Sequence, residues 1–129
     1  MTATTIISAV AVGATGAYGT NPTKTTLAAT TTAFAINVSL TNGACAGDPG
    51  KTVRVYFACS EFSISAAQAT AQLKRTAAIL ELRPHESPAG VNIEVTPLFG
   101  RTGSYVYAWT EEPTFAAAGV LSAILYELN

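Results

Sequence analysis

The chain has 129 residues and a net charge of −1; 49% of its residues are apolar and only 12% are charged. This length suits one domain with one hydrophobic core, and the charged share is about half of the usual quarter. A disordered chain would be poorer in apolar residues, and no apolar run approaches the ~18 residues of a membrane-spanning helix. The seven Lys and Arg residues are dispersed, whereas a nucleic-acid binder groups its cations. We therefore expect neither a nucleic-acid partner nor a membrane partner.

Ala and Thr dominate the composition, with twenty-four Ala and nineteen Thr residues. Thr suits strands because its β-branched side chain packs on a pleated surface, and Ala fits between closely packed sheets. A surface with so little charge is weakly solubilising. This composition favours a chain whose surface is covered by partners in an assembly.

The first 22 residues have two interpretations. Met1–Thr5 lacks the positive charge that opens a signal peptide, so we expect synthesis in the cytoplasm without export. Thr4–Val12 is apolar and β-branched, and residues 13–22 are rich in Gly and other small residues, which predicts a loop. The segment is predicted to be either an arm that reaches a neighbouring subunit or the first strand, with a β-sandwich domain over residues 23–129. In the arm alternative, the residues that contact the neighbour are Ile6, Ile7, Val10, Val12 and Tyr18, and deleting residues 2–12 would leave the sandwich folded.

Strict alternation of apolar and polar residues, the signature of a half-buried strand, marks the next segments. Lys24–Thr41 predicts one long strand or two in series, and the alternation is strictest from Phe34 to Leu40. Turn signals lie between residues 42 and 50, and Val53–Phe57 alternates again as a strand.

A short helix is predicted near residues 65–75. Ser65 is a suitable N-cap, the Ala-rich stretch that follows has high helix propensity, and cations come near its end. Ala77–Arg83 then predicts a strand, and two prolines bound a loop over residues 83–90.

The last forty residues carry the clearest pattern. Val91–Thr96 and Tyr105–Thr110 alternate around a Gly-rich turn, which predicts a β-hairpin with Phe99 near its tip, and Gly119–Leu128 predicts a final strand. About seven strands with turn signals between them predict an all-β fold, an antiparallel β-sandwich or jelly roll.

The two cysteines, Cys45 and Cys59, leave three alternatives open. They are two free thiols, an intramolecular disulfide that closes the hairpin around residues 42–50, or disulfides between subunits. A bridge of either kind would stabilise the protein by about 2–4 kcal/mol.

Catalytic and metal-binding patterns are weak. His85 is the only histidine and sits in a proline-bounded loop without a Gly-x-Ser-x-Gly motif. One His and two Cys spaced by thirteen residues do not match a zinc framework. Glu81 and Glu94 lie in predicted strands, where solvated charges are commoner than a glycosidase pair. We expect no enzyme activity, no metal and no cofactor.

Tyr105, Tyr107 and Trp109 form an aromatic ladder on one strand face. Such ladders can stack on sugars or single-stranded nucleic acid. Packing in the core, or in an interface where Tyr and Trp are enriched, is the favoured interpretation, because no grouped cations accompany the rings.

Three C-terminal segments resemble a known class of proteins. Gly103–Trp109, Glu112-Pro113-Thr114 and the sequence LSAILYEL at Leu121–Leu128 are similar to the ends of small all-β virion proteins of tailed bacteriophages. That class comprises head decoration, collar and tail-associated proteins. The resemblance implies a homo-oligomer, often a trimer, that contacts the major capsid protein or other virion proteins, with an N-terminal arm at Thr2–Tyr18.

Together these patterns predict a non-enzymatic structural protein of the virion that decorates or cements a phage capsid through contacts between subunits. The alternative is a carbohydrate- or receptor-binding β-sandwich that uses Tyr105, Tyr107, Trp109 or the His85 loop. That alternative predicts exposed rings, whereas the assembly hypothesis predicts buried ones.

Overall fold

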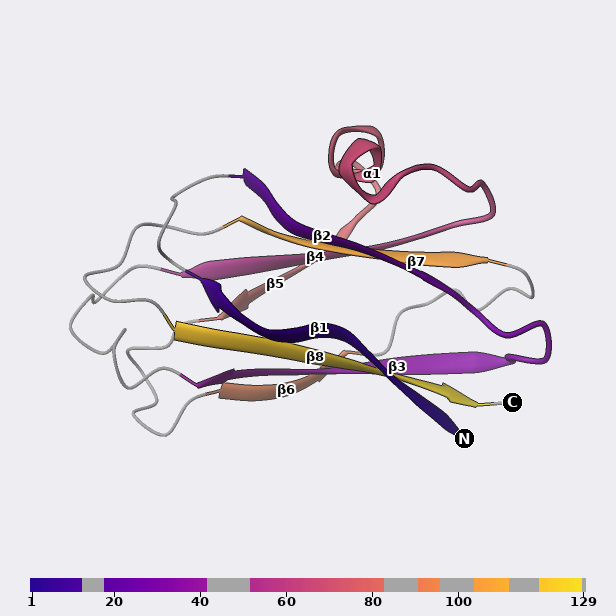
Figure 1. Ribbon diagram of the computed structural model, residues 1–129, viewed down its shortest axis with the longest axis horizontal. Helices are drawn as coiled ribbons and strands as arrows, with labels where there is room; N and C mark the ends of the chain where they lie inside the picture. The colour runs from indigo at the N-terminus through magenta and orange to yellow at the C-terminus, as the bar shows by residue number, and fades with distance from the viewer. Residues whose placement is uncertain (13–17, 42–51, 83–90, 96–103, 112–118, 129) are drawn as a thin grey trace.

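The structure is a computed structural model that describes residues 1–12, 18–41, 52–82, 91–95, 104–111 and 119–128 (Figure 1). Within these ranges the chain forms eight strands and one short helix. The elements are β1 (Thr2–Val12), β2 (Tyr18–Thr26), β3 (Ala33–Thr41), β4 (Val53–Ser60), α1 (Ala66–Gln72), β5 (Ala78–Leu82), β6 (Val91–Val95), β7 (Tyr105–Glu111) and β8 (Gly119–Leu128).

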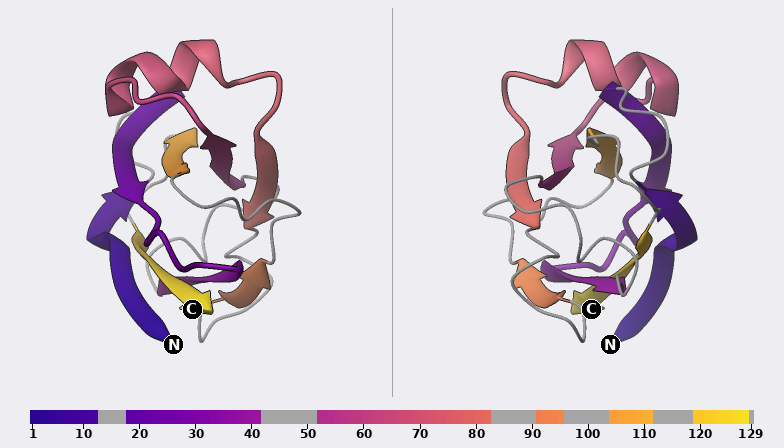
Figure 2. Two further views of the ribbon diagram at one scale, coloured as in Figure 1. Left: turned by 90° about the vertical axis from the view of Figure 1, so that its right-hand side faces the viewer. Right: turned by 90° about the vertical axis from the view of Figure 1, so that its left-hand side faces the viewer.

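The strands form two four-stranded sheets that pack face to face (Figures 1 and 2). The first sheet has the order β1-β8-β3-β6 and the second sheet has the order β2-β7-β4-β5. All described strand pairs are antiparallel. The chain passes from one sheet to the other at almost every connection, which is the eight-stranded double Greek key of a jelly roll. The predicted all-β sandwich is confirmed.

The main core lies between the two sheets and follows from the alternation in the sequence. On β8 the residues Leu121, Ala123 and Leu125 are buried while their neighbours are partly or fully exposed. The same pattern on β3 buries alternate residues from Phe34 to Leu40, as predicted. Apolar side chains from both sheets meet in this one cluster, and the burial of their surface is the main force that holds the sheets together.

Residues 2–12 are a strand of the chain's own first sheet. β1 pairs with β8 from Thr2 opposite Glu127 to Val12 opposite Gly119. Ile6, Ile7 and Val12 are buried in the main core. The first-strand alternative therefore describes this segment, and the sandwich includes residues on both sides of the boundary expected at residue 23.

The loop predicted over residues 13–22 is wrong from Tyr18 onward, because β2 begins there. Gly19, Asn21 and Pro22, which contributed to the loop prediction, instead lie in an irregular stretch of an edge strand. Gly19 and Asn21 have positive φ angles of 76° and 53°, and the register with β7 shifts twice in this stretch. Such β-bulges are common in edge strands, which also tolerate a proline such as Pro22.

The hairpin predicted from β6 and β7 is also wrong. β6 pairs with β3 in the first sheet, while β7 lies between β2 and β4 in the second sheet. Both strands exist where they were predicted, but alternation reveals only that a segment is a strand and does not reveal its neighbours. The predicted turn and Phe99 lie outside the described residues.

The segment from Lys24 to Thr41 forms two strands in different sheets, with a crossing at residues 27–32. Glu127 holds this crossing in place although its side chain is buried. Its Oε2 accepts hydrogen bonds from the Ala28 backbone N–H at 2.8 Å and from the Thr31 hydroxyl. The Thr32 N–H donates to the Leu128 carbonyl at 2.8 Å. The crossing between the sheets is thus fastened to the end of the chain.

The predicted helix is confirmed as α1, which covers the outer face of the second sheet (Figure 1). Ser65 caps it: its hydroxyl accepts from the Gln68 N–H, and the Gln68 side chain accepts from the Ser65 N–H. This reciprocal capping box satisfies two donors that an uncapped helix would leave free. Ala69 is the buried residue of the helix.

Candidate functional site

The predicted aromatic face lies beneath α1 and is not a surface. Tyr107 and Trp109 have no exposed area, and Tyr105 is partly buried. Trp109 stacks on Tyr56 of the neighbouring strand, with ring centroids 5.4 Å apart and planes 5° apart. Together with Ala58 and Ala69 these rings form a second buried cluster, which we call the aromatic core.

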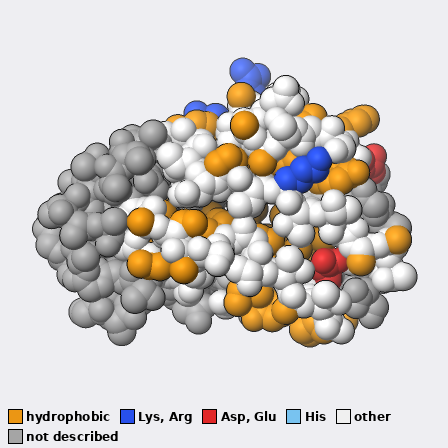
Figure 3. Space-filling view, viewed as in Figure 1, with side chains coloured by type: hydrophobic (Ala, Val, Ile, Leu, Met, Phe, Trp, Pro, Cys, Tyr) orange, Lys and Arg blue, Asp and Glu red, His pale blue; other side chains and the backbone are white. Residues whose placement is uncertain are grey.

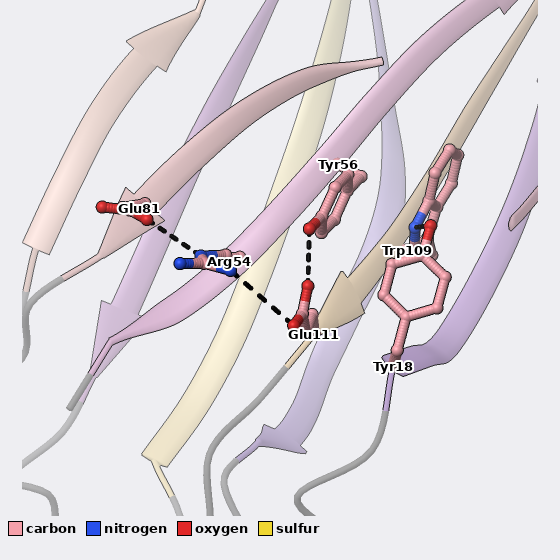
Figure 4. Close-up of polar contacts among 6 residues, drawn as sticks. All are labelled: Tyr18, Arg54, Tyr56, Glu81, Trp109 and Glu111. Carbon is pink, nitrogen blue, oxygen red and sulfur yellow. Dashed lines mark hydrogen bonds and ion pairs between the residues drawn. The ribbon is translucent and has the colours of Figure 1, made fainter. Parts of the chain in front are cut away.

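The polar atoms of the aromatic core bond to one another and to α1. The Trp109 indole Nε1–H donates to the Tyr18 hydroxyl at 2.8 Å (Figure 4). That hydroxyl in turn donates to the Thr70 carbonyl at 2.7 Å. Burial raises the pKa of Tyr18, so the hydroxyl stays protonated and keeps both bonds at neutral pH. Lys74 covers the outer side of the Tyr18 ring, with Nζ 4.3 Å from its centroid. Tyr107 and Trp109 therefore present no ring face to a sugar.

Tyr107 shapes the segment between β4 and α1. Its hydroxyl accepts from the Ile64 N–H at 3.0 Å and donates to the Phe62 carbonyl at 2.9 Å. Lys24 reaches the same segment through the Ser63 hydroxyl. The buried ring therefore positions a surface segment and does not itself contact solvent.

A polar row of Glu111, Arg54 and Glu81 crosses three strands of the second sheet (Figure 4). The Arg54 Nε donates to Glu81 Oε1 at 2.8 Å, and an Arg54 terminal nitrogen lies 3.7 Å from Glu111 Oε1. These side chains are 35–45% exposed, so the ion pairs are solvated and contribute little to stability. The bond to Glu81 and the charges of both carboxylates raise the pKa of Arg54.

Tyr56 connects the polar row to the aromatic core. Its hydroxyl donates to Glu111 Oε2 at 2.5 Å. Burial of the ring, followed by the hydrogen bond to Glu111, raises the pKa of Tyr56 to about 12. The Tyr56 hydroxyl therefore stays protonated at neutral pH and keeps this bond.

A second line of side chains runs beside the polar row. Trp109 lies opposite Tyr56, and Tyr56 lies opposite Ile79 of β5. We call Trp109, Tyr56 and Ile79 the apolar row. It is buried at Trp109 and Tyr56 but emerges at the edge of the sheet, where Ile79 is 55% exposed.

Sequence reasoning did not single out Arg54, Tyr56, Glu81, Glu111 and Ile79 as a group. They occupy three strands that are distant in the sequence, and their proximity depends on the pairing of β4 with β5 and β7. The one signal in the sequence was the presence of two charged residues, Arg54 and Glu81, within segments predicted to be strands.

The residues predicted to contact a neighbour through an arm belong to the two cores. Ile6, Ile7 and Val12 lie in the main core, and Val10 is partly buried against it. Tyr18 is partly buried against the aromatic core. These side chains stabilise the chain's own fold and do not form an exposed contact surface.

Cys59 carries a free thiol that is partly buried against the main core. Burial raises the pKa of this thiol, with a smaller opposing contribution from its hydrogen bond to Ser104. A raised pKa keeps the thiol protonated and weakly nucleophilic at neutral pH. Cys45, the other half of the predicted pair, lies outside the described residues, as do His85 and its loop.

Among the described residues, no three His, Cys, Asp or Glu side chains gather where they could hold a metal ion. In the same part of the chain, no helix has the length and apolar character needed to cross a membrane. The described part of the face seen in Figure 3 carries few charged side chains and several apolar ones. The polar row and the apolar row both reach β5 at the edge of the second sheet. We therefore take the outer face of this sheet, next to that edge, as the strongest candidate site.

No protein-family model matches the chain, and no curated protein matches it.

Proposed function

We propose that this protein is a non-enzymatic structural protein of a virus particle, a capsid decoration or cement protein that stabilises the particle through contacts between subunits. The observation that carries the proposal is the jelly-roll strand order, β1-β8-β3-β6 against β2-β7-β4-β5. Jelly rolls occur in viral capsid proteins, lectins and cupins. Because one fold hosts several functions, side-chain chemistry has to choose among them.

The side chains favour assembly over sugar binding. A lectin that uses Tyr107 and Trp109 needs exposed rings, and both are fully buried under α1. Only 12% of all residues in the chain are charged, and so small a share suits a protein that buries much of its exterior against partners. Its exposed apolar side chains include Ile79, Val120 and Leu128.

Two measurements test the proposal. The first is the solution mass of the purified chain by light scattering, with and without reductant. The second is co-expression with the proteins encoded beside it, followed by cosedimentation and electron microscopy of the resulting particles. We expect the chain to sediment with particles and to raise their resistance to heat.

A chain that remains at the top of the gradient, while it binds glycans on an array, would replace the proposal with the carbohydrate-binding alternative. Particles formed by this chain alone would make it a shell subunit and would refute the decoration role. A mass that falls on addition of reductant would place a disulfide between subunits.

A further inference from the structure

We propose that the exposed edge of β5 is a self-association site, at which two copies pair their β5 strands antiparallel about a two-fold axis with Ile79 opposite its counterpart. The inference deepens the proposed function, on which it rests for its biological role, by naming one surface through which subunits meet. The contact is isologous, so it yields pairs and not the trimer that the resemblance implies.

Two of the four edge strands, β1 and β2, carry irregularities that resist strand addition. β1 and β2 lie along one side of the sandwich, and β5 and β6 lie along the other (Figure 2). β1 and β2 each contain two register shifts, and positive φ angles occur at Ala9, Gly19 and Asn21. Bulges of this kind twist an edge away from a further strand.

β5 lacks these protective irregularities. Its register with β4 is continuous from Ala78 opposite Phe57 to Leu82 opposite Val53. On the outer face of the sheet, β5 carries the exposed side chains of Ile79 and Glu81. Among the described strands β5 has β4 as its one neighbour, so a regular, partly apolar edge presents backbone donors and acceptors to an incoming strand.

Charge and hydrophobicity select the register of the pair. A register with Glu81 opposite its counterpart would place like charges face to face, which is destabilising. A register centred on Leu80 would place Ile79 opposite Glu81, so that each apolar row would meet a polar row. A register centred on Ile79 joins the two apolar rows through an Ile–Ile contact. It sets Glu81 of each copy opposite Ala77 of the other, away from the two-fold axis.

The inner face favours the same register. With Ile79 at the centre, Leu80 of one copy lies opposite Ala78 of the other. Leu80 is partly buried against the main core, and Ala78 is exposed, so pairing covers apolar surface on both faces of the strand. A net charge of −1 on each copy adds little repulsion. These features identify a second copy of this chain as the occupant of the edge.

The first test is the solution mass of the full chain by sedimentation equilibrium over a range of concentrations. We expect the wild type to approach twice its 13.3 kDa monomer mass. Ile79→Lys places two like charges at the two-fold axis, so this variant is expected to remain a monomer. Val120→Lys is the matched control, because Val120 is an exposed apolar strand residue of the first sheet with a similar exposure of 42%.

The second test reads the register by disulfide formation in a background with Cys45 and Cys59 replaced by Ser. Ile79→Cys is expected to form a covalent dimer under mild oxidation, because directly opposed residues have Cβ atoms ~5 Å apart. Glu81→Cys is expected not to cross-link to itself, because the two Glu81 positions lie four residues out of register. Circular dichroism of each variant verifies that it remains folded.

Three outcomes would overturn the inference: a folded wild type that stays monomeric at all concentrations, equal association of Ile79→Lys and wild type, or cross-linking at position 81 in preference to position 79. The proposed function is judged separately by sedimentation with particles. If Ile79→Lys associates like the wild type but also joins particles, the β5 contact is refuted and the virion role stands. A chain that dimerises through β5 but never sediments with particles would support the β5 contact and refute the virion role.

Discussion

At the scale of single residues, Tyr56 gives the protein a predictable response to alkaline pH. Its pKa is raised to about 12 in the folded chain, first by burial and then by its bond to Glu111, while an unfolded chain has a tyrosine pKa of about 10. The folded state therefore holds the proton more tightly. This contribution to stability is complete below about pH 10 and is lost as the pH rises toward 12.

A spectroscopic titration of tyrosinate in the folded protein is expected to show one tyrosine with a midpoint near 12 that disappears in Tyr56→Phe. Glu111→Gln is expected to lower that midpoint only in part, because burial of the ring remains. A Tyr56 midpoint at the ordinary value would contradict the buried position of its hydroxyl.

Glu127 is the polar residue whose loss should cost the most. Glu127→Ala would leave the Ala28 N–H and the Thr31 hydroxyl without their acceptor in a buried position, which costs about 1–3 kcal/mol. Glu127→Gln retains an acceptor oxygen and is expected to lose less. Urea unfolding measures the difference.

Glu81→Ala is the control for charge removal, because Glu81 is 42% exposed in its ion pair with Arg54 and such pairs contribute only about 0–1 kcal/mol. Equal destabilisation by Glu81→Ala and Glu127→Ala would mean that Glu127 does not fasten the crossing at residues 27–32.

At the scale of elements, α1 depends on its cap. The helix has seven residues, too short to be stable without tertiary contacts. Ser65→Ala is expected to lower the free energy of unfolding by about 1 kcal/mol, and Ser65→Asp is expected to restore most of it because a carboxylate can accept the same N–H bond. Denaturation monitored by circular dichroism tests both variants, and an Asp variant as weak as the Ala variant would argue against capping.

Removal of β1 is expected to unfold the sandwich, contrary to the result anticipated for a free arm. Deleting residues 2–12 removes Ile6, Ile7 and Val12 from the main core, at about 1.5–3 kcal/mol for each buried side chain. That sum is comparable with the whole stability of a small domain, about 5–15 kcal/mol. Circular dichroism of the truncated chain, alone and with a peptide of residues 1–12 added, makes the test. A folded truncation without the peptide would revive the arm hypothesis.

The elements show where sequence patterns were sufficient and where they were not. Alternation located β3 and β8 because each buries one face. β4 and β7 also alternate in sequence, but they bury both faces, one against each core. Ser65 located the start of α1 because capping is a local interaction. The partner of β6 was mispredicted because pairing depends on contacts between distant residues. Tyr18 was placed in a loop because Gly19 and Asn21 give the same signal in a bulge as in a turn.

The candidate site was less predictable than the fold for the same reason. Trp109 and Tyr107 were expected to pack in a core or an interface, and their burial agrees with the first of these. The polar row could not be inferred, because Arg54 lies between Glu81 and Glu111 only once three strands have paired. Single side chains carry local information, whereas a site on a sheet is a property of its register.

At the scale of the whole molecule, the two cores are expected to unfold together. β4 and β7 supply side chains to the main core on one face and to the aromatic core on the other. Loss of either core would therefore disrupt β4 and β7, which also support the other core. Trp109 fluorescence reports the aromatic core and far-ultraviolet circular dichroism reports the sheets, so their unfolding transitions should coincide.

Acrylamide should quench Trp109 weakly in the folded protein and strongly after unfolding, because the side chain has no exposed area. Separate transitions for fluorescence and circular dichroism would show that α1 and the rings beneath it open independently of the sandwich.

The pairing of β1 with β8 has a consequence for synthesis. Thr2 lies opposite Glu127, so β1 leaves the ribosome long before β8, the strand that becomes its neighbour. Contacts between residues so distant in sequence slow folding, and an unpaired apolar strand is prone to aggregation while it waits. The first sheet can therefore close only after β8 has been synthesised, and the nascent chain must stay soluble until that strand emerges.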